Sequence, residues 1–219
     1  MVDAAYWNED IQQAYFFGGT RYARIKFTPG TPEEKITWGP ETITRYWPSL
    51  VKAGFGTVDA VLPVPGVKGE AYFFRGSRYV RIKVVPETSD DTIVYGPHKI
   101  TDKWASLAKA GFDTVDAAME VPGKDGEAYF FRGANYVRVH VWDDKVVYGP
   151  AKLATEWPGL TEAGFDTVDA ALPIAKGNGE TYFFNGINYV KIRVVASAPD
   201  KITYGPKPIA DHWKTLNWV

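Results

Sequence analysis

The chain has 219 residues, a net charge of −1 at neutral pH and a pI near 6.3, which argue against a protein built to bind nucleic acid or an acidic membrane. It contains no cysteine, so disulfides, thiolate chemistry and cysteine-ligated zinc are excluded. Apolar residues make up 45 % of the chain and aromatic residues 15 %, so we expect a sizeable core and no extensive disorder.

The chain opens with Met1-Val2-Asp3-Ala4-Ala5 and shows no basic-then-apolar leader. No apolar run approaches the roughly 20 residues that a membrane span requires, so we expect no membrane partner. These observations favour a cytoplasmic protein, although a secreted protein whose signal peptide had been removed would show the same sequence.

An aromatic motif then occurs four times along the chain. Gln13-Ala14-Tyr15-Phe16-Phe17 returns as Glu70–Phe74, Glu127–Phe131 and Glu180–Phe184. Spacing this regular is the signature of a repeat architecture. The four copies almost fill the chain and leave no room for a separate catalytic domain.

The second copy shows what one repeat contains. Four short strands are predicted at 58–62, 70–74, 79–84 and 92–95, with a tight turn at 75–78 and breakers at Pro63, Pro65 and Gly96-Pro97. Apolar residues at positions 100, 104 and 107 then fit two turns of amphipathic helix. Each repeat is therefore expected to be four antiparallel strands followed by one short helix.

Four such units predict an all-β fold, a four-bladed β-propeller, because radial repetition protects sheet edges that a flat array would leave open. The middle position of each first strand is alanine, which suits four strands that converge on one axis: Asp3-Ala4-Ala5, Asp59-Ala60-Val61, Asp116-Ala117-Ala118 and Asp169-Ala170-Ala171. The blades are expected near residues 2–57, 58–114, 115–167 and 168–219. The helix tryptophans Trp47, Trp104, Trp157 and Trp213 are expected to be buried anchors.

The tandem of Asp-Ala-Ala, Glu-Ala-Tyr-Phe-Phe-x-Gly, Tyr-Val-Arg-Ile and Tyr-Gly-Pro, with a helix that bears Trp, resembles the hemopexin repeat. The resemblance covers essentially residues 2 to 218. The free-standing, cysteine-free form is most similar to legume seed albumins of the albumin-2 type, and free-standing bacterial and fungal hemopexin-like proteins are also candidates.

The resemblance implies a narrow channel that holds structural ions. It implies calcium bound by the main-chain carbonyls of Asp3, Asp59, Asp116 and Asp169. It also implies chloride, or a second cation such as sodium, at the main chain of Ala5, Val61, Ala118 and Ala171. Oxygen donors suit a hard cation. The alternative is that these positions serve only to pack the axis.

A search for other chemistry finds no catalytic constellation, and we expect no enzyme. His98, His140 and His212 lie in different copies, and no His-Glu-x-x-His motif is present. His140 stands where the other copies have Lys26, Lys83 and Arg193, so it is the candidate haem ligand, although a solvated strand residue is favoured.

Two charge patterns remain. Basic residues line the third strands: Arg21, Arg24, Lys26, Arg78, Arg81, Lys83, Arg138, Lys191 and Arg193. They either form a surface for an anionic ligand or, as we favour, cover apolar blade faces with their long side chains. Acidic residues in the loops that follow either attract a polyamine or another cation or, as we favour, are solvated turns: Glu33-Glu34, Asp90-Asp91, Asp143-Asp144 and Asp200.

Two functions are consistent with these observations. The first is a non-catalytic binding or storage protein that carries channel ions and a small ligand such as haem or spermine. The alternative is a lectin-like or toxin-like recognition module that binds a glycan or a protein partner through a blade face. A monomer or a homodimer fits either function.

Overall fold

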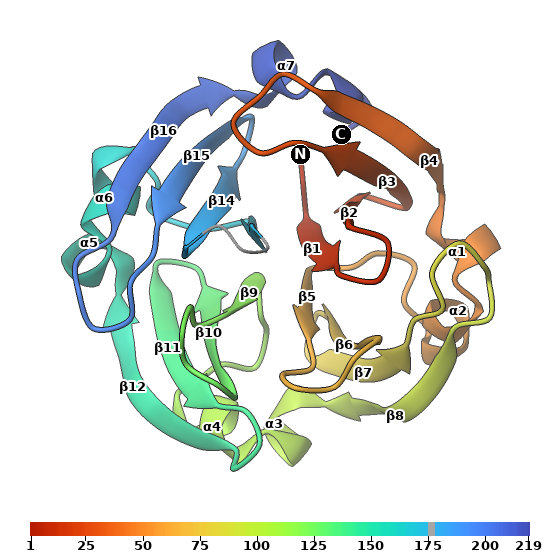
Figure 1. Cartoon of the computed structure of the whole chain (residues 1–219). Coiled ribbons are helices and arrows are strands. Elements are labelled where there is room, and N and C mark those ends of the chain that lie inside the picture. Colours follow the sequence, from red (N-terminus) through yellow and green to blue (C-terminus); the bar gives the residue numbers. More distant parts are fainter. Residues whose placement is uncertain (175–177) are drawn as a thin grey trace.

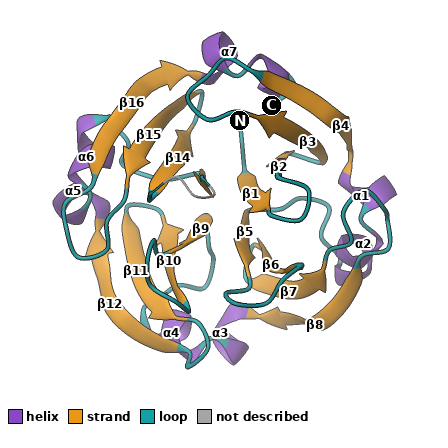
Figure 2. Ribbon diagram, viewed as in Figure 1, coloured by secondary structure: helices purple, strands orange, loops and turns teal. Residues whose placement is uncertain are grey.

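The structure, a computed structural model, describes residues 1–174 and 178–219. Four antiparallel sheets of four strands each surround a central axis, and each sheet consists of strands that are consecutive in the sequence (Figure 1). Short helices lie at the outer rim (Figure 2). The predicted four-bladed propeller is therefore confirmed. No helix in these two ranges is both long and apolar enough to cross a membrane.

Blade 1 contains β1 Ala4–Asn8, β2 Gln13–Gly18, β3 Arg21–Phe27, β4 Glu34–Thr42, α1 Ile43–Tyr46 and α2 Pro48–Ala53. Blade 2 contains β5 Ala60–Pro63, β6 Glu70–Arg75, β7 Arg78–Lys83, β8 Thr92–Lys99, α3 Ile100–Lys103 and α4 Ala105–Lys109. Blade 3 contains β9 Ala117–Glu120, β10 Glu127–Arg132, β11 Asn135–His140, β12 Lys145–Lys152, α5 Leu153–Glu156 and α6 Pro158–Glu162. Blade 4 contains β13 Ala170–Pro173, β14 Glu180–Asn185, β15 Asn188–Arg193, β16 Lys201–Pro208, α7 Ile209–His212 and the 3₁₀ helix η1 Lys214–Leu216.

The hydrophobic core is divided among the four junctions between blades. Because side chains alternate across a strand, the two phenylalanines of each aromatic motif face opposite neighbours. Each junction therefore holds one edge-to-face phenylalanine pair, with ring centroids 5.9 to 6.2 Å apart: Phe16–Phe184, Phe17–Phe73, Phe74–Phe130 and Phe131–Phe183. The repeated motif thus supplies both sides of every junction.

The four helix tryptophans lie in these junctions. Each is 3 to 5 % exposed, which confirms the predicted burial. Each indole packs against the first phenylalanine of the next blade: Trp47 on Phe73, Trp104 on Phe130, Trp157 on Phe183 and Trp213 on Phe16. The tryptophans therefore tie each blade to its successor.

The prediction of one continuous helix per repeat is wrong. The helix is split at the tryptophan, whose backbone is non-helical; Trp104, for example, has φ −117° and ψ 84°. Proline follows the tryptophan in blades 1 and 3, and a residue that precedes proline is driven out of the helical region. Blade 2 has alanine at this position and keeps the same break, at which a carboxylate of the next blade contacts the start of the second helix.

That contact corrects a second expectation, that the acidic loops are solvated turns. One carboxylate from each loop accepts hydrogen bonds from the start of the second helix in the preceding blade. Asp91 accepts from Ser49 N at 2.8 Å, Asp144 from Ala105 N at 2.6 Å, and Asp200 from Gly159 N at 3.0 Å. These acids therefore act as caps between blades, satisfying amides that a helix start leaves without a partner.

The ring closes by the same device. Glu34 of blade 1 accepts hydrogen bonds from Thr215 N at 3.1 Å and from the Thr215 hydroxyl at 2.8 Å, in blade 4. The two termini lie near each other at this junction (Figure 1). Closure thus combines one capping carboxylate with the Trp213–Phe16 packing, in a chain that has no cysteine for a disulfide.

Candidate functional site

The four inner strands converge on the axis of the propeller. β1 contacts β5 and β13, and β9 contacts the same two strands, so the four form a closed ring. The alanines predicted to line this ring are each 1 or 2 % exposed: Ala4, Ala60, Ala117 and Ala170. Larger side chains would hold the strands apart, so the repeated alanine permits the approach.

An aspartate stands immediately before each inner strand, and its side chain has a structural task. Each carboxylate accepts a hydrogen bond of 2.6 or 2.7 Å from a glycine amide in the hairpin turn of the same blade: Asp3 from Gly19, Asp59 from Gly76, Asp116 from Gly133 and Asp169 from Gly186. Each carboxylate therefore fixes the hairpin turn between the second and third strands of its own blade. The main-chain carbonyls of these aspartates are the groups for which the resemblance to the hemopexin repeat implies a role as ion ligands.

The four carboxylates lie close enough to influence one another. Burial is the largest cause that raises the pKa of Asp59 and of Asp169. The negative charges of Asp3 and Asp116 raise both values further. A ring of this kind has excess negative potential, and every donor in it is oxygen, which fits a hard cation such as calcium. Side chains alone do not form a metal site, because no group of three or more His, Cys, Asp or Glu suited to a metal occurs in the part of the chain that the structure describes.

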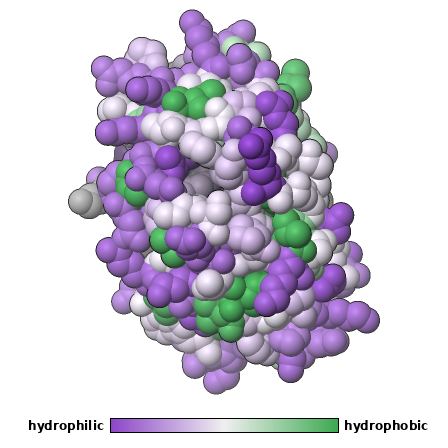
Figure 3. Space-filling model, turned by 90° about the vertical axis from the view of Figure 1, so that its right-hand side faces the viewer, coloured by the Kyte–Doolittle hydropathy of each residue, from purple (hydrophilic) through white to green (hydrophobic). Residues whose placement is uncertain are grey.

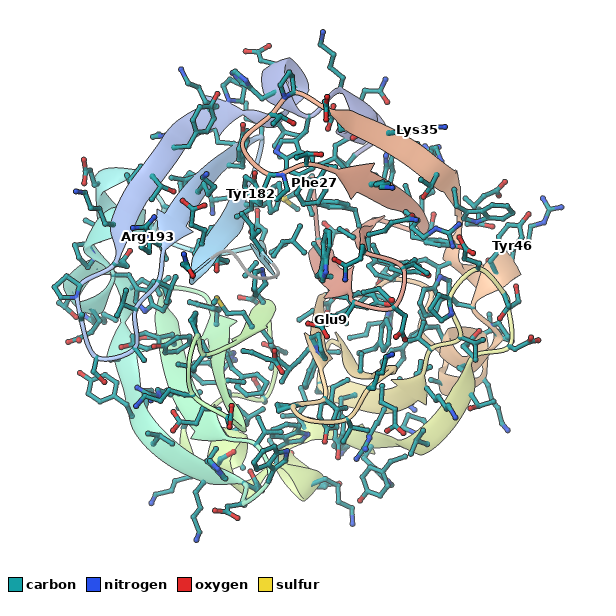
Figure 4. All side chains as sticks on the ribbon, viewed as in Figure 1. Glu9, Phe27, Lys35, Tyr46, Tyr182 and Arg193 are labelled. Carbon is teal, nitrogen blue, oxygen red and sulfur yellow. The ribbon has the colours of Figure 1, made fainter. Side chains whose placement is uncertain are left out.

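A cavity of about 850 Å³ opens on the axis between the loops that follow the inner strands. It reaches inward as far as Ala5, Val61, Ala118 and Ala171, the predicted second ring. Acidic residues surround its mouth. Glu9 lies near the centre of the ring in Figure 4. Burial raises the pKa of Glu120, and the charges of Glu9 and Asp125 raise it further.

Sequence reasoning did not single out two residues of this mouth. Glu120 occupies a position where blades 2 and 4 have Pro63 and Pro173. Trp142 stands where those blades have Val85 and Val195, and it is 55 % exposed. Its indole Nε1 donates a hydrogen bond to the carbonyl of Pro65 at 3.0 Å, and its ring covers Gly126. Both residues depart from the repeat, as His140 does, and this departure is the signal in the sequence that indicates them.

The histidines are not brought together. His140 Nδ1 lies 3.2 Å from Asp143 Oδ2, and its ring meets Trp142 edge-on. His98 packs against Tyr95, and His212 Nδ1 lies 3.3 Å from the Tyr204 hydroxyl. Haem ligation by His140 stays a prediction, as do the ion sites.

Comparisons with known proteins agree with the geometry. The Hemopexin family model matches residues 2–51 and 115–162. Albumin-2 of Lathyrus sativus is 28 % identical over 219 residues, which cover 98 % of this chain and 95 % of that protein. A plant albumin from Cicer arietinum showing hemagglutination superposes with a TM-score of 0.92 at 28 % identity, covering 100 % of this chain and 98 % of that one. A plant lectin with two metal binding sites from Cicer arietinum gives 0.91 at 26 % identity, covering 100 % and 99 %.

Proposed function

We propose that this chain, which matches the Hemopexin family model at residues 2–51 and 115–162 and is similar along its whole length to legume albumins, is a non-catalytic binding or storage protein whose channel holds structural ions. The convergence of four aspartates on the axis carries the proposal. Because their side chains are committed to hairpin amides, the main-chain carbonyls of Asp3, Asp59, Asp116 and Asp169 would hold calcium. The main chain at Ala5, Val61, Ala118 and Ala171 would hold chloride or sodium. The structural relative with two metal binding sites supports this assignment.

Thermal melts of a demetallated sample test the channel. A cation that binds only the folded protein raises the melting temperature by mass action, so added calcium should raise it and a chelator should reverse the shift. Asp116→Asn keeps both the main-chain carbonyl and a side-chain oxygen, so calcium should still raise the melting temperature of this variant. Absence of any calcium-dependent shift, together with a purified protein free of metal by elemental analysis, would overturn the proposal.

The acidic mouth adds a small-ligand component. Glu9, Glu120 and Asp125 give it a negative charge that fits a polyamine such as spermine. Calorimetry with spermine should show binding that weakens in Glu120→Gln and with added salt. Titration with hemin, followed by absorbance, tests haem binding, which His140→Ala should abolish. Spermine affinity unchanged in Glu120→Gln would contradict the placement of the polyamine at the mouth.

The second candidate is a lectin-like recognition module, favoured by Trp142. An exposed indole that is fixed by a hydrogen bond offers a flat, preorganised face for a sugar ring. The hemagglutinating relative supports this function. Agglutination and a glycan array should show activity that Trp142→Ala removes. Ile187→Ala, at a hairpin tip where the side chain is 76 % exposed, is the matched control and should leave activity unchanged. Equal activity of both variants would contradict the role of Trp142.

A further inference from the structure

A second cavity lies outside the channel, at the junction between blades 1 and 2. Its volume is about 130 Å³, and its walls include Tyr15, Tyr22, Arg24, Trp38, Tyr46 and Glu87. Tyr46 lies at the outer rim of the propeller (Figure 4). This side of the molecule, which carries β4 and β8, shows small apolar patches among polar side chains (Figure 3). The cavity contains a buried cation, because the Arg24 side chain is only 9 % exposed.

Arg24 departs from the repeat in its ion pairing. In blades 2, 3 and 4 the corresponding basic residue pairs with a glutamate at the start of the second strand: Arg81 with Glu70 at 2.6 Å, Arg138 with Glu127, and Lys191 with Glu180 at 3.2 Å. Blade 1 has Gln13 in place of that glutamate. Gln13 accepts a hydrogen bond from the Thr37 hydroxyl, to which Arg24 Nε also donates, at 3.2 Å. The second strand of blade 1 therefore supplies Arg24 with no carboxylate.

The carboxylate that contacts Arg24 comes instead from the neighbouring blade. Glu87 Oε1 lies 3.3 Å from the Arg24 guanidinium, on the loop between β7 and β8. The Glu87 side chain is 59 % exposed, so this partner reaches the buried cation from solvent. A buried cation requires a partner, but an exposed loop side chain gains little from the contact and can be displaced. Arg24 is therefore the one of these four basic residues whose contacting carboxylate is mostly exposed.

Two aromatic residues of the cavity also depart from the repeat. Trp38 replaces the tyrosine of the other blades, and Tyr46 replaces Lys103, Glu156 or His212. Their rings meet edge-on with centroids 5.3 Å apart. Trp38 Nε1 donates a hydrogen bond to the Tyr22 hydroxyl at 2.9 Å, which fixes the indole. Blade 1 thus combines a fixed aromatic wall with a guanidinium.

We propose that this cavity binds a small aromatic carboxylate, whose carboxylate replaces Glu87 on Arg24 while its ring packs against Trp38 and Tyr46. Guanidinium and carboxylate groups match in a planar, two-bonded geometry, which favours a carboxylate over a neutral group. A cavity of roughly 150 Å³ accommodates benzene in another protein, so the volume here suits a single ring. The ligand class is therefore benzoate-like.

Calorimetry and NMR titration with benzoate test the proposal in the full-length protein. Benzoate should bind and shift the Trp38 indole N–H resonance. Benzamide has the same shape without the charge and should bind at least about tenfold more weakly, since the charged hydrogen bond is lost. Benzylamine, which is cationic, should not bind. Failure of benzoate to bind at millimolar concentration, or equal binding of benzamide, would overturn the proposal.

Two substitutions locate the site. Gln13→Glu supplies the glutamate that the other three blades contain, so its carboxylate should pair with Arg24. The affinity for benzoate should then fall at least about tenfold, without a lower melting temperature. Glu87→Gln removes the competing carboxylate and should strengthen benzoate binding several-fold. The matched control is Ser197→Glu, which adds a negative charge at the corresponding loop position of blade 4 and should leave the affinity unchanged. Benzoate binding that is unchanged in both Gln13→Glu and Glu87→Gln would place the ligand elsewhere and refute the assignment.

Discussion

Two neighbouring junctions, between blades 2 and 3 and between blades 3 and 4, have the same tryptophan–phenylalanine packing. They differ in the hydrogen bonds that their capping carboxylates accept. Asp144 accepts hydrogen bonds from Ala105 N at 2.6 Å, from Ser106 N at 3.0 Å and from the Ser106 hydroxyl. Asp200 accepts one from Gly159 N at 3.0 Å, and its Oδ1 is buried without a hydrogen-bond partner within residues 1–174 and 178–219.

Two residues explain the difference. Blade 3 has Pro158 where blade 2 has Ala105, and proline has no amide N–H to donate. It also has Gly159 where blade 2 has Ser106, so the hydroxyl that contacts Asp144 has no counterpart. Burial then raises the pKa of Asp200 to about 6, and the backbone hydrogen bond from Gly159 lowers it only in part. The ionisation of an acid at this place in the fold therefore depends on its hydrogen bonds as well as on its burial.

The largest expected effect tests whether the apolar parts of the two junctions are equivalent. Trp104→Ala and Trp157→Ala should each lower the free energy of unfolding by about 3–5 kcal/mol, because each leaves a large cavity against a phenylalanine of the next blade. Denaturant unfolding measures both values. A difference between them of more than about 2 kcal/mol would show that the junctions differ in more than their acids.

The next largest effect is the pH dependence of stability at the junction between blades 3 and 4. Because the pKa of Asp200 is about 6 in the folded protein and 3.8 in an unfolded chain, the folded state holds the extra proton between these values. The contribution of Asp200 to stability is therefore full below about pH 4 and lost as the pH rises through 6, by up to roughly 3 kcal/mol.

Asp200→Asn should remove that dependence. The difference in unfolding free energy between wild type and variant, followed from pH 4 to 7.5, isolates Asp200 from the other acids with raised pKa values, Asp59, Asp91, Glu120 and Asp169. Parallel curves for the two proteins would show that Asp200 does not titrate in this interval.

The smallest expected effect concerns the two capping carboxylates themselves, Asp144 and Asp200. Asp144→Ala leaves two helix amides and a hydroxyl without their acceptor and should lower the free energy of unfolding by about 2 kcal/mol at pH 7.5. At the same pH, Asp200→Ala removes a buried charge that has few hydrogen-bond donors, so it should lower the free energy of unfolding by less than about 1 kcal/mol. Chemical denaturation of both variants decides the point. If the two substitutions lower the free energy of unfolding equally, the unpartnered Oδ1 of Asp200 does not destabilise the folded state.

Much of the fold could be predicted from the sequence, because the information is local and repeated. The Tyr-Phe-Phe motif alternates at the period of a strand, and its four occurrences indicate four blades. The burial of the four tryptophans could also be predicted. The break in each helix could not be predicted, because the apolar spacing at 100, 104 and 107 is the same whether the helix continues or turns at Trp104.

The site shows the same division. The aspartates that precede the inner strands occupy the same position in each repeat, and the resemblance to the hemopexin repeat implies their role at the ion site. The structure brings their charges together. The mouth residues Glu120 and Trp142, and the cavity at Arg24, lie where one blade differs from the others. Such differences are visible in the sequence, but their meaning depends on which neighbour each side chain faces.

By itself, the sequence determined the number of blades, the strands within each, the aromatic core and the small residues on the axis, because these follow from side-chain size and periodicity along short segments. The tertiary structure decided which acids are caps, which cation lacks an acid in its own blade and which carboxylate is buried without a partner. Those outcomes depend on contacts between residues far apart in the chain, such as Glu34 with Thr215. No local pattern encodes them, because the free energy of a charge is set by the groups that the neighbouring blade brings to it.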